Sequence, residues 1–288
     1  MTASFDPRVT PVRADLAAAH LRGQVSAPRY AEGQAMTIAA SRAAMKGRPD
    51  PAASRTSELL FGEGFTVYDC AGGWAWGQAA HDGYVGYIPA DCLAPAGMPA
   101  THMVARLATH IYPAPDLKTP PVMPLYLGSR VRVEGEPVKG FAPVNGGGFV
   151  YAAHLRPLDA PGADPLAVAE SFLGAPYLWG GRTVAGIDCS GLVQQALLAA
   201  GIPCPRDSDQ QAASVGRLLS EDVRLARGDI VFFPGHVGIM VDDARLLHAN
   251  ATHMAVTVDP LDAVIEIVAR GLAPGKPPVT ARRRVPRQ

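Results

Sequence analysis

The residue best suited to covalent chemistry is Cys189, which stands where a glycine-rich loop gives way to a predicted helix. Behind it, apolar residues recur with a period near that of a helix face. They are Leu192, Val193, Ala196, Leu197 and Ala200. A helix N-terminus carries partial positive charge, which favours a thiolate over a thiol. A free cysteine is more often a small buried hydrophobe, but the helix start and the flanking glycines favour a nucleophile here.

Two histidines downstream are candidates for activating this thiol. His236 opens a predicted strand on which Gly238 shares its face and leaves room beside the imidazole. His248 lies on the next predicted strand, and histidines on neighbouring strands of a hairpin can meet across the sheet. One imidazole would take the thiol proton while the other holds its ring by a hydrogen bond. His253 would face away from His248 on an unbroken strand, so His248 is the preferred orienting residue.

Composition limits the classes of function that need to be considered. The chain has 288 residues, of which 48% are hydrophobic, and its 26 basic residues balance its 26 acidic ones. This balance disfavours a nucleic-acid binder or a polybasic membrane anchor, and we interpret the basic tail ARRRVPR (281–287) as a solvated strand edge or terminus. No apolar run reaches the length of a spanning helix. The first residues lack a secretory signal pattern, so we expect a cytoplasmic protein with free thiols, and the cysteines lack the spacing of a metal site.

The elements that must position these residues fall into two styles. Up to about residue 160 the chain consists of short apolar runs separated by glycine and proline, which indicates strands and turns, apart from a possible short helix over 12–22. GFTVYDCAGGWAWGQAAHDGYVGYIPADCLAP (64–95) aligns with GSRVRVEGEPVKGFAPVNGGGFVYAAHLRPL (128–158), which indicates two copies of one small all-β unit. Beyond the linker at 159–165, helical spacing and buried strands predict a separate α+β domain.

The last domain resembles the NlpC-type cysteine peptidases, a papain-like group that cleaves bacterial cell-wall peptides. The resemblance is carried by PYLWGG, GIDCSGLV, PRDSDQQ, GDIVFFPGHVGIM and LLHANA, in this order. It implies an α+β core in which a nucleophile helix packs on an antiparallel sheet, with a Cys–His–His set at Cys189, His236 and His248. The two β units resemble bacterial SH3-like domains.

This resemblance predicts the domain plan. An N-terminal extension is expected at 1–32, a first SH3-like barrel at 33–97 and a second at 98–158. The peptidase domain is expected at 159–288.

The resemblance also implies a substrate. It is similar to the freed stem peptide L-Ala-γ-D-Glu-diamino acid of murein, cut after γ-D-Glu. In members built this way the first SH3-like domain closes one end of the cleft, so that only a free amino terminus fits. We therefore expect an enzyme that recycles small peptides, with no metal or organic cofactor and no nucleic acid, membrane or obligate protein partner.

Further positions carry over from the family residue by residue. Tyr177 resembles the tyrosine whose hydroxyl helps to form the oxyanion site with the backbone N–H of Cys189. The positions that match the dipeptide pocket are Trp179, Asp188, Ser190 and Ser208. Asp188 suits a substrate ammonium group and equally suits a helix N-cap. In the first β unit, Glu58 and Tyr84 resemble the residues that meet the substrate amine, with Glu63 as a rival acid.

Three alternatives stay open on the sequence alone. The first is an amidase or acyltransferase of the same clan, acting with the same residues on another amide or ester. The second is a non-catalytic module that binds cell-wall peptides, although a binder has no need of a thiol at a helix start. The third is a redox enzyme that uses Cys189, although it lacks an obvious resolving cysteine nearby in sequence and Cys204 is its one candidate.

Overall fold

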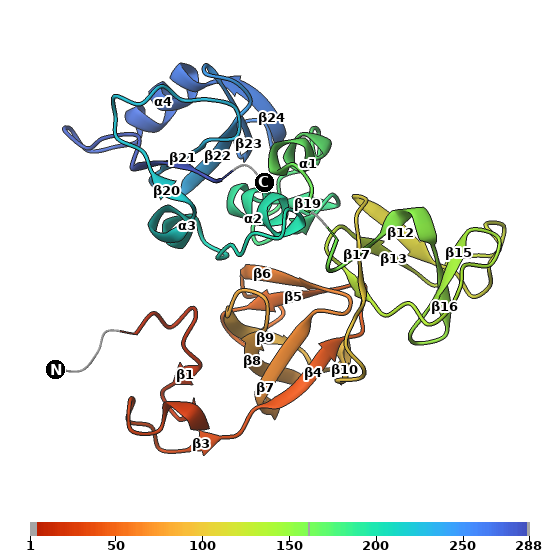
Figure 1. Ribbon diagram of the computed structural model, residues 1–288. Coiled ribbons are helices and arrows are strands. Elements are labelled where there is room, and N and C mark those ends of the chain that lie inside the picture. Colours follow the sequence, from red (N-terminus) through yellow and green to blue (C-terminus); the bar gives the residue numbers. More distant parts are fainter. Residues whose placement is uncertain (1–4, 161, 287–288) are drawn as a thin grey trace. The chain divides into compact units, whose positions relative to one another are not determined.

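The chain divides into two compact units, Met1–Ala160 and Pro161–Gln288. The structure is a computed structural model that describes residues 5–160 and 162–286. Residues 1–4 of the predicted extension, residue 161 of the linker and residue 287 of the basic tail lie outside the described residues. No described helix is long and apolar enough to cross a membrane. Figure 1 shows a first unit built of strands and a second unit that combines helices with a sheet.

The first unit opens with a small three-stranded sheet in the order β1-β2-β3. Its elements are β1 (Val12–Arg13), β2 (Leu16–Ala18), η1 (Ala19–Leu21) and β3 (Tyr30–Ala31). The short helix predicted over 12–22 is therefore wrong. β2 pairs with β1 on one side and with β3 on the other, and its three residues are buried. Pairing with a distant segment outweighs the local helical spacing, which is a common outcome for short apolar runs.

The next segment forms a seven-stranded antiparallel sheet in the order β10-β4-β7-β8-β9-β5-β6. Its elements are β4 (Gln34–Ile38), β5 (Arg42–Lys46), β6 (Arg55–Leu60), β7 (Gly64–Ala71), β8 (Trp74–Ala79), β9 (Val85–Pro89), η2 (Ala90–Cys92) and β10 (Leu93–Pro95). Alternate residues face a core that contains Ile38, Met45, Leu59, Phe65 and Ile88. Gly72 and Gly73 both have positive φ and make the tight turn between β7 and β8.

The remainder of the first unit has a core of its own, built on Val104, Leu125, Val131 and Val150. Its elements are β11 (His102–Val104), β12 (Ala108–Ile111), β13 (Met123–Tyr126), β14 (Arg130–Val131), β15 (Phe141–Val144), β16 (Gly148–Tyr151), η3 (Ala152–His154) and β17 (Leu155–Pro157). The two aligned segments each end in a strand, a one-turn 3-10 helix and a short strand. The sequence repeat therefore corresponds to a repeat of elements.

The second unit is built on a six-stranded sheet in the order β20-β25-β21-β22-β23-β24, with every neighbouring pair antiparallel. Its strands are β20 (Arg217–Leu218), β21 (Ile230–Phe233), β22 (His236–Met240), β23 (Arg245–Asn250), β24 (Ala255–Pro260) and β25 (Ala281–Arg284), beside a small hairpin of β18 (Arg182–Thr183) and β19 (Gly186–Ile187). Its helices are α1 (Pro165–Ser171), α2 (Cys189–Ala199), α3 (Ser208–Ser214) and α4 (Leu261–Arg270).

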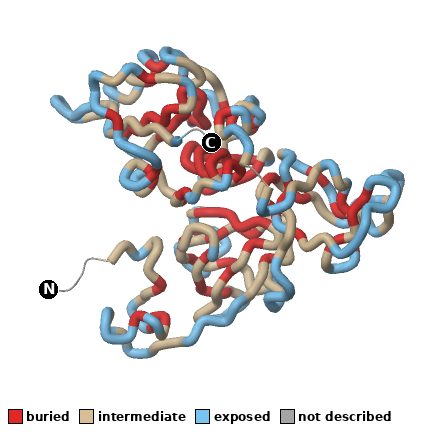
Figure 2. The backbone as a smooth tube through the Cα atoms, viewed as in Figure 1, coloured by how far each residue is buried: buried red, intermediate tan, exposed pale blue. Residues whose placement is uncertain are grey.

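Helix α2 is the buried helix of this unit. It packs on β22 and β23, and ten of its eleven residues are buried. Figure 2 shows this burial as a red coil. A helix that is buried on every side has fixed neighbours all round, so its first residue is held firmly against the sheet.

The basic tail is not a solvated edge, because β25 lies between β20 and β21 inside the sheet. The Arg283 guanidinium donates to backbone carbonyls near the end of α3, including that of Ala213 at 2.8 Å. Arg284 donates through two nitrogens to the buried carboxylate of Asp229, each at 2.7 Å. These arginines are therefore used to fasten the last strand to the sheet and to α3.

Candidate active site

Cys189 occupies the first position of α2 and is buried, with 7% of its surface exposed. Asp188 caps the helix, since its Oδ1 accepts from the backbone N–H of Gly191 at 2.7 Å. The backbone N–H groups of Ser190 and Val237 point at the thiol and favour its ionised form. Val237 directly follows His236, so the thiol lies against the start of β22.

The carboxylate of Asp188 has other partners as well. Its Oδ2 accepts from Gly180 N at 2.8 Å and from the Arg206 Nη2 at 2.6 Å. Arg206 also donates to the Ser190 hydroxyl at 2.8 Å, and both members of the Asp188–Arg206 ion pair are buried. The structure thus gives Asp188 the N-cap role, one of the two that the sequence allowed, and its predicted contact with a substrate ammonium group stays a prediction.

The two predicted histidines meet as expected from the hairpin. His236 Nε2 lies 2.7 Å from His248 Nδ1, and the two rings are inclined at 63°. His248 is buried whereas His236 is partly exposed. Strands β22 and β23 are neighbours in the sheet, and this brings residues twelve apart in sequence into contact.

The sequence reasoning missed two residues that continue this chain of contacts. Asp259 Oδ2 lies 2.9 Å from His248 Nε2 and accepts from the Thr257 hydroxyl at 2.8 Å. Thr257 is the direct neighbour of His248 across the β23–β24 pair. The signal was present in the alternation of AVTVDP (255–260), which places Thr257 and Asp259 on the face that His248 shares.

Burial sets the resting charges of the site. It raises the pKa of Cys189 to about 12, with a further contribution from the Asp188 carboxylate. Burial and the neighbouring His248 lower the pKa of His236 from 6.5 to about 4. Desolvation therefore opposes the effect that the sequence predicts for the helix N-terminus. The resting pair is a neutral thiol and a neutral imidazole.

Tyr177 lies close enough to Cys189 and Asp188 for their charges to affect it. Burial raises its pKa to about 12, and those two groups add to the effect. Its backbone N–H donates to the Met254 carbonyl at 2.8 Å, which ties the loop before α2 to the turn after β23. Tyr177 therefore keeps its phenolic proton near the thiol and can serve as a hydrogen-bond donor.

The predicted pocket residues of the second unit differ in exposure. Trp179 is 62% exposed, while Ser190 is buried beside the Asp188–Arg206 pair. Ser208 begins α3 and is partly exposed. The side-chain amide of Gln211 links α3 to α2 by donating to the Ser190 carbonyl at 3.0 Å.

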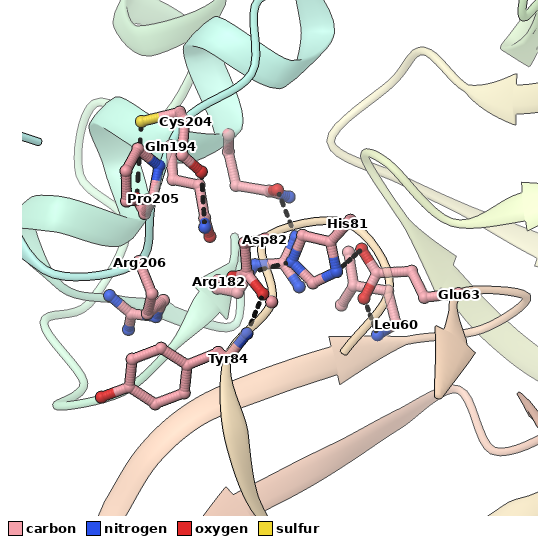
Figure 3. A network of polar contacts seen from close by, with 12 residues as sticks. Leu60, Glu63, His81, Asp82, Tyr84, Arg182, Gln194, Cys204, Pro205 and Arg206 are labelled. Atoms are coloured by element: carbon pink, nitrogen blue, oxygen red, sulfur yellow. Dashed lines mark hydrogen bonds and ion pairs between the residues drawn. The ribbon is translucent and has the colours of Figure 1, made fainter. Parts of the chain in front are cut away.

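The three predicted residues of the first unit have partners within that unit. The Glu58 carboxylate is buried and forms ion pairs with Arg55 and Arg42. Glu63 accepts from the Leu60 backbone N–H at 2.8 Å and lies 3.8 Å from His81 (Figure 3). Tyr84 is buried in the core cluster of the seven-stranded sheet. Their predicted contacts with a substrate amine stay predictions.

Cys204 shows no sign of a redox partnership. All four cysteines are free, and Cys204 is buried. Its thiol lies 3.5 Å from the Pro205 carbonyl, and its own carbonyl accepts from Gln194 at 3.2 Å (Figure 3). Cys204 is thus held by local backbone contacts.

Each of the two units contains a segment that matches a known protein family. Residues 174–266 match the NlpC/P60 family, and residues 47–93 match the bacterial dipeptidyl-peptidase Sh3 domain. Residues 174–266 are thus similar to an NlpC/P60 domain. The predicted resemblance, the fold class and the assignment to a family of cysteine peptidases are confirmed by these matches.

Individual relatives of the NlpC/P60 domain agree with this assignment. Dipeptidyl-peptidase 6 of Lysinibacillus sphaericus is 35% identical over 105 residues, which make up 36% of this chain and 38% of that protein. The gamma-D-glutamyl-L-lysine dipeptidyl-peptidase of Bacillus cereus is 32% identical over 114 residues, 36% of this chain and 34% of that protein. The chain thus matches little more than a third of the length of these relatives.

A solved structure supports the fold over a longer stretch. The crystal structure of an NlpC/P60 family protein from Bacillus cereus superposes with a TM-score of 0.72 at 20% identity. The match covers 87% of this chain and 99% of that one. At this identity the likeness shows the fold alone.

Proposed function

We propose that this protein is a cysteine endopeptidase that hydrolyses the γ-D-glutamyl–diamino acid bond of murein stem peptides with a free N-terminal L-Ala. The observation that carries the proposal is the 2.7 Å contact of His236 with His248, next to a buried thiol at the start of a helix. A module that only binds peptides would need neither the paired histidines nor a thiol at a helix start. The name of the Bacillus cereus relative, a gamma-D-glutamyl-L-lysine dipeptidyl-peptidase, supports the choice of bond.

In the first half of the reaction, His236 takes the thiol proton of Cys189 as the sulfur attacks the γ-glutamyl carbonyl carbon. The carbonyl oxygen gains negative charge, which the backbone N–H of Cys189 and the Tyr177 hydroxyl stabilise. A first-turn N–H has no acceptor within its own helix and is therefore suited to this task. The C–N bond then breaks, and His236 returns the proton to the leaving amine.

In the second half, water replaces the amine. His236 takes a proton from this water as its oxygen attacks the thioester carbon, and the C–S bond breaks. The proton returns to the sulfur, which restores the neutral thiol and releases L-Ala-D-Glu. The neutral resting pair inferred from the pKa shifts of Cys189 and His236 is the state that this cycle starts from and regenerates.

The test is hydrolysis of L-Ala-γ-D-Glu-meso-diaminopimelate and of the lysine analogue by the full-length protein. Each peptide is compared with its N-acetylated form, and Cys189→Ala and Cys204→Ala are the matched variants. We expect cleavage of the free-amine peptides only, lost in Cys189→Ala and retained in Cys204→Ala, whose thiol is occupied by local backbone contacts.

Other outcomes separate the alternatives. Equal cleavage of free and acetylated peptides would keep the catalytic set and remove the free-amine requirement. Cleavage of neither, by a folded protein whose Cys189 is alkylated no faster than the other thiols, would overturn the peptidase proposal in favour of a binding module. Glu58→Gln and Glu63→Gln, measured on the same pair of peptides, decide which acid governs the free-amine preference.

We also propose that the enzyme works in the cytoplasm, on small peptides released from the wall, without an obligate protein partner. Recycling of freed stem peptides suits such a location. Fractionation of cells that make the protein, with a cytoplasmic enzyme and a periplasmic or secreted enzyme as markers, tests this. Recovery with the exported marker would contradict it.

A further inference from the structure

Asp259 lies next to His248 on the side away from His236, and it has no role in the reaction proposed above. It lies on β24, at the sheet edge next to the strand of His248, and its side chain is 25% exposed. Two hydrogen bonds converge on one oxygen, Oδ2, from His248 Nε2 at 2.9 Å and from the Thr257 hydroxyl at 2.8 Å, and His253 Nε2 lies 3.4 Å from the same atom. Thr257 is itself held by the Asn250 amide, which donates to its hydroxyl oxygen at 2.8 Å.

This arrangement fixes which atom donates and which accepts in the two hydrogen bonds that link Asp259, His248 and His236. Burial opposes ionisation of Asp259, but the hydrogen bonds from His248 and Thr257 prevail and its pKa is lowered. An ionised carboxylate only accepts hydrogen bonds, so His248 must donate from Nε2. The Nδ1 of neutral His248 is then an acceptor, and His236 must donate to it from Nε2.

The tautomer of His236 decides whether its Nδ1 can act as the base. A neutral imidazole that carries its proton on Nε2 has a lone pair on Nδ1. His236 therefore keeps Nδ1 free to accept the proton of the Cys189 thiol. With the opposite tautomer, Nδ1 would carry a hydrogen and the ring would be unable to act as the base.

We infer that Asp259 is a positioning residue which selects the tautomers of both histidines and stabilises the positive charge that His236 acquires from Cys189. This inference rests on the proposed function, since it concerns the base of that reaction. The titratable groups that face Asp259 are His248 of β23 and His253 of the turn that follows it. His236 in turn faces His248 and the start of α2.

Asp259→Asn tests the charge without removing the acceptor. Because His248 and Thr257 both donate to Oδ2, the amide places its oxygen there and the tautomers are retained. We expect kcat to fall roughly a hundredfold with KM nearly unchanged, at the lower end of what general-base catalysis contributes. Loss of the carboxylate charge disfavours protonated imidazole, so the acidic limb of the kcat/KM profile should move to lower pH.

Two further variants serve as controls, one that removes a nearby charge and one that keeps the charge at position 259. Asp262→Asn removes a charge three residues away on the exposed side of α4 and should leave both kcat and the acidic limb unchanged. Asp259→Glu keeps the charge and should recover part of the activity. A wild-type kcat and pH profile in Asp259→Asn would overturn the inference.

The tautomers can be measured without any turnover. We would record nitrogen-15 spectra of histidine-labelled full-length Cys189→Ala protein, in which both histidines should be protonated on Nε2 and unprotonated on Nδ1. Adding Asp259→Ala removes the acceptor, and a mixture of tautomers should appear. A proton on Nδ1 of His236 with Asp259 intact would contradict the inference even if the peptide is cleaved, whereas the expected spectra with no cleavage would fault the proposed function alone.

Discussion

Asp188 shows how one side chain can fix the position of a nucleophile through contacts with the backbone. Its two oxygens accept from the backbone at Gly191 and Gly180, and the second also binds Arg206. The first contact starts α2 at Cys189, and the second holds the preceding loop. The cap and the ion pair account for the burial of this aspartate, and its contact with a substrate ammonium group stays a prediction.

Removing the charge of Asp188 is expected to destabilise the second unit. In Asp188→Asn the cap survives in part, but the Arg206 guanidinium, whose side chain is 1% exposed, loses its buried ion pair with this carboxylate. Breaking one partner of a buried pair costs about 3–5 kcal/mol, which should appear as a lower urea midpoint at unchanged slope. Asp188→Asn with Arg206→Met should recover much of the loss. A single variant as stable as the wild type would refute the importance of the pair.

At the scale of elements, the approach of α2 to the loop before it depends on a glycine in the first helical turn. A Cβ on Gly191 would lie 2.4 Å from the Gly181 carbonyl oxygen and 2.9 Å from Asp188 Oδ1. The backbone oxygen cannot move away without shifting the loop that also carries Tyr177. Gly191 thus allows the close contact between α2 and the loop of Tyr177, the proposed oxyanion donor near Cys189.

Gly191→Ala should therefore lower both stability and activity. In an ordinary helix interior the same change stabilises by about 1 kcal/mol, so the expected sign is opposite to that of helix propensity. Thermal unfolding and peptide hydrolysis measure the two effects. The control is Gly201→Ala beyond the end of α2, where φ is positive but a Cβ meets nothing. It should lower stability through backbone strain and leave kcat unchanged.

The elements also show what sequence reasoning can and cannot deliver here. Local signals sufficed for α2, for the strands that carry His236 and His248, and for their meeting across a hairpin. Asp259 was missed because only the strands that carry His236 and His248 were searched for partners, and Asp259 lies on the next strand of the sheet. The helix predicted over 12–22 failed because β2 is stabilised by pairing with β3, and such contacts between distant segments leave no periodic trace.

The whole molecule consists of two copies of a small β unit followed by the peptidase-like unit. The repeat could be predicted from the sequence because turn glycines and aromatic strands recur in the same order in both copies. The place of the last strand was not readable. β25 lies between β20 and β21, about fifty residues beyond β21, and an arginine-rich run resembles a solvated terminus until its acceptors are known.

The desolvation of His236 makes the stability of the molecule depend on pH. The unfolded chain binds a proton on His236 near pH 6.5, whereas the folded chain does so near 4. Stability is therefore complete above about pH 6.5 and falls as the pH drops towards 4, by about 3 kcal/mol from this group alone. Hydrogen exchange of residues 230–250 in the intact protein measures the trend. His236→Gln should weaken it, and an unchanged slope in that variant would refute the assignment.

The position of β25 has a consequence for the newly made chain. Until residues 281–284 have left the ribosome and joined the sheet, β21 has an unpaired edge directly beside the strand that carries His236. An exposed strand edge is a template for aggregation, and pairing across so long a stretch of chain is slow. Stop codons or proteolytic trimming just before residue 281 should therefore yield insoluble protein and a dependence on chaperones, rather than a soluble enzyme of lower activity.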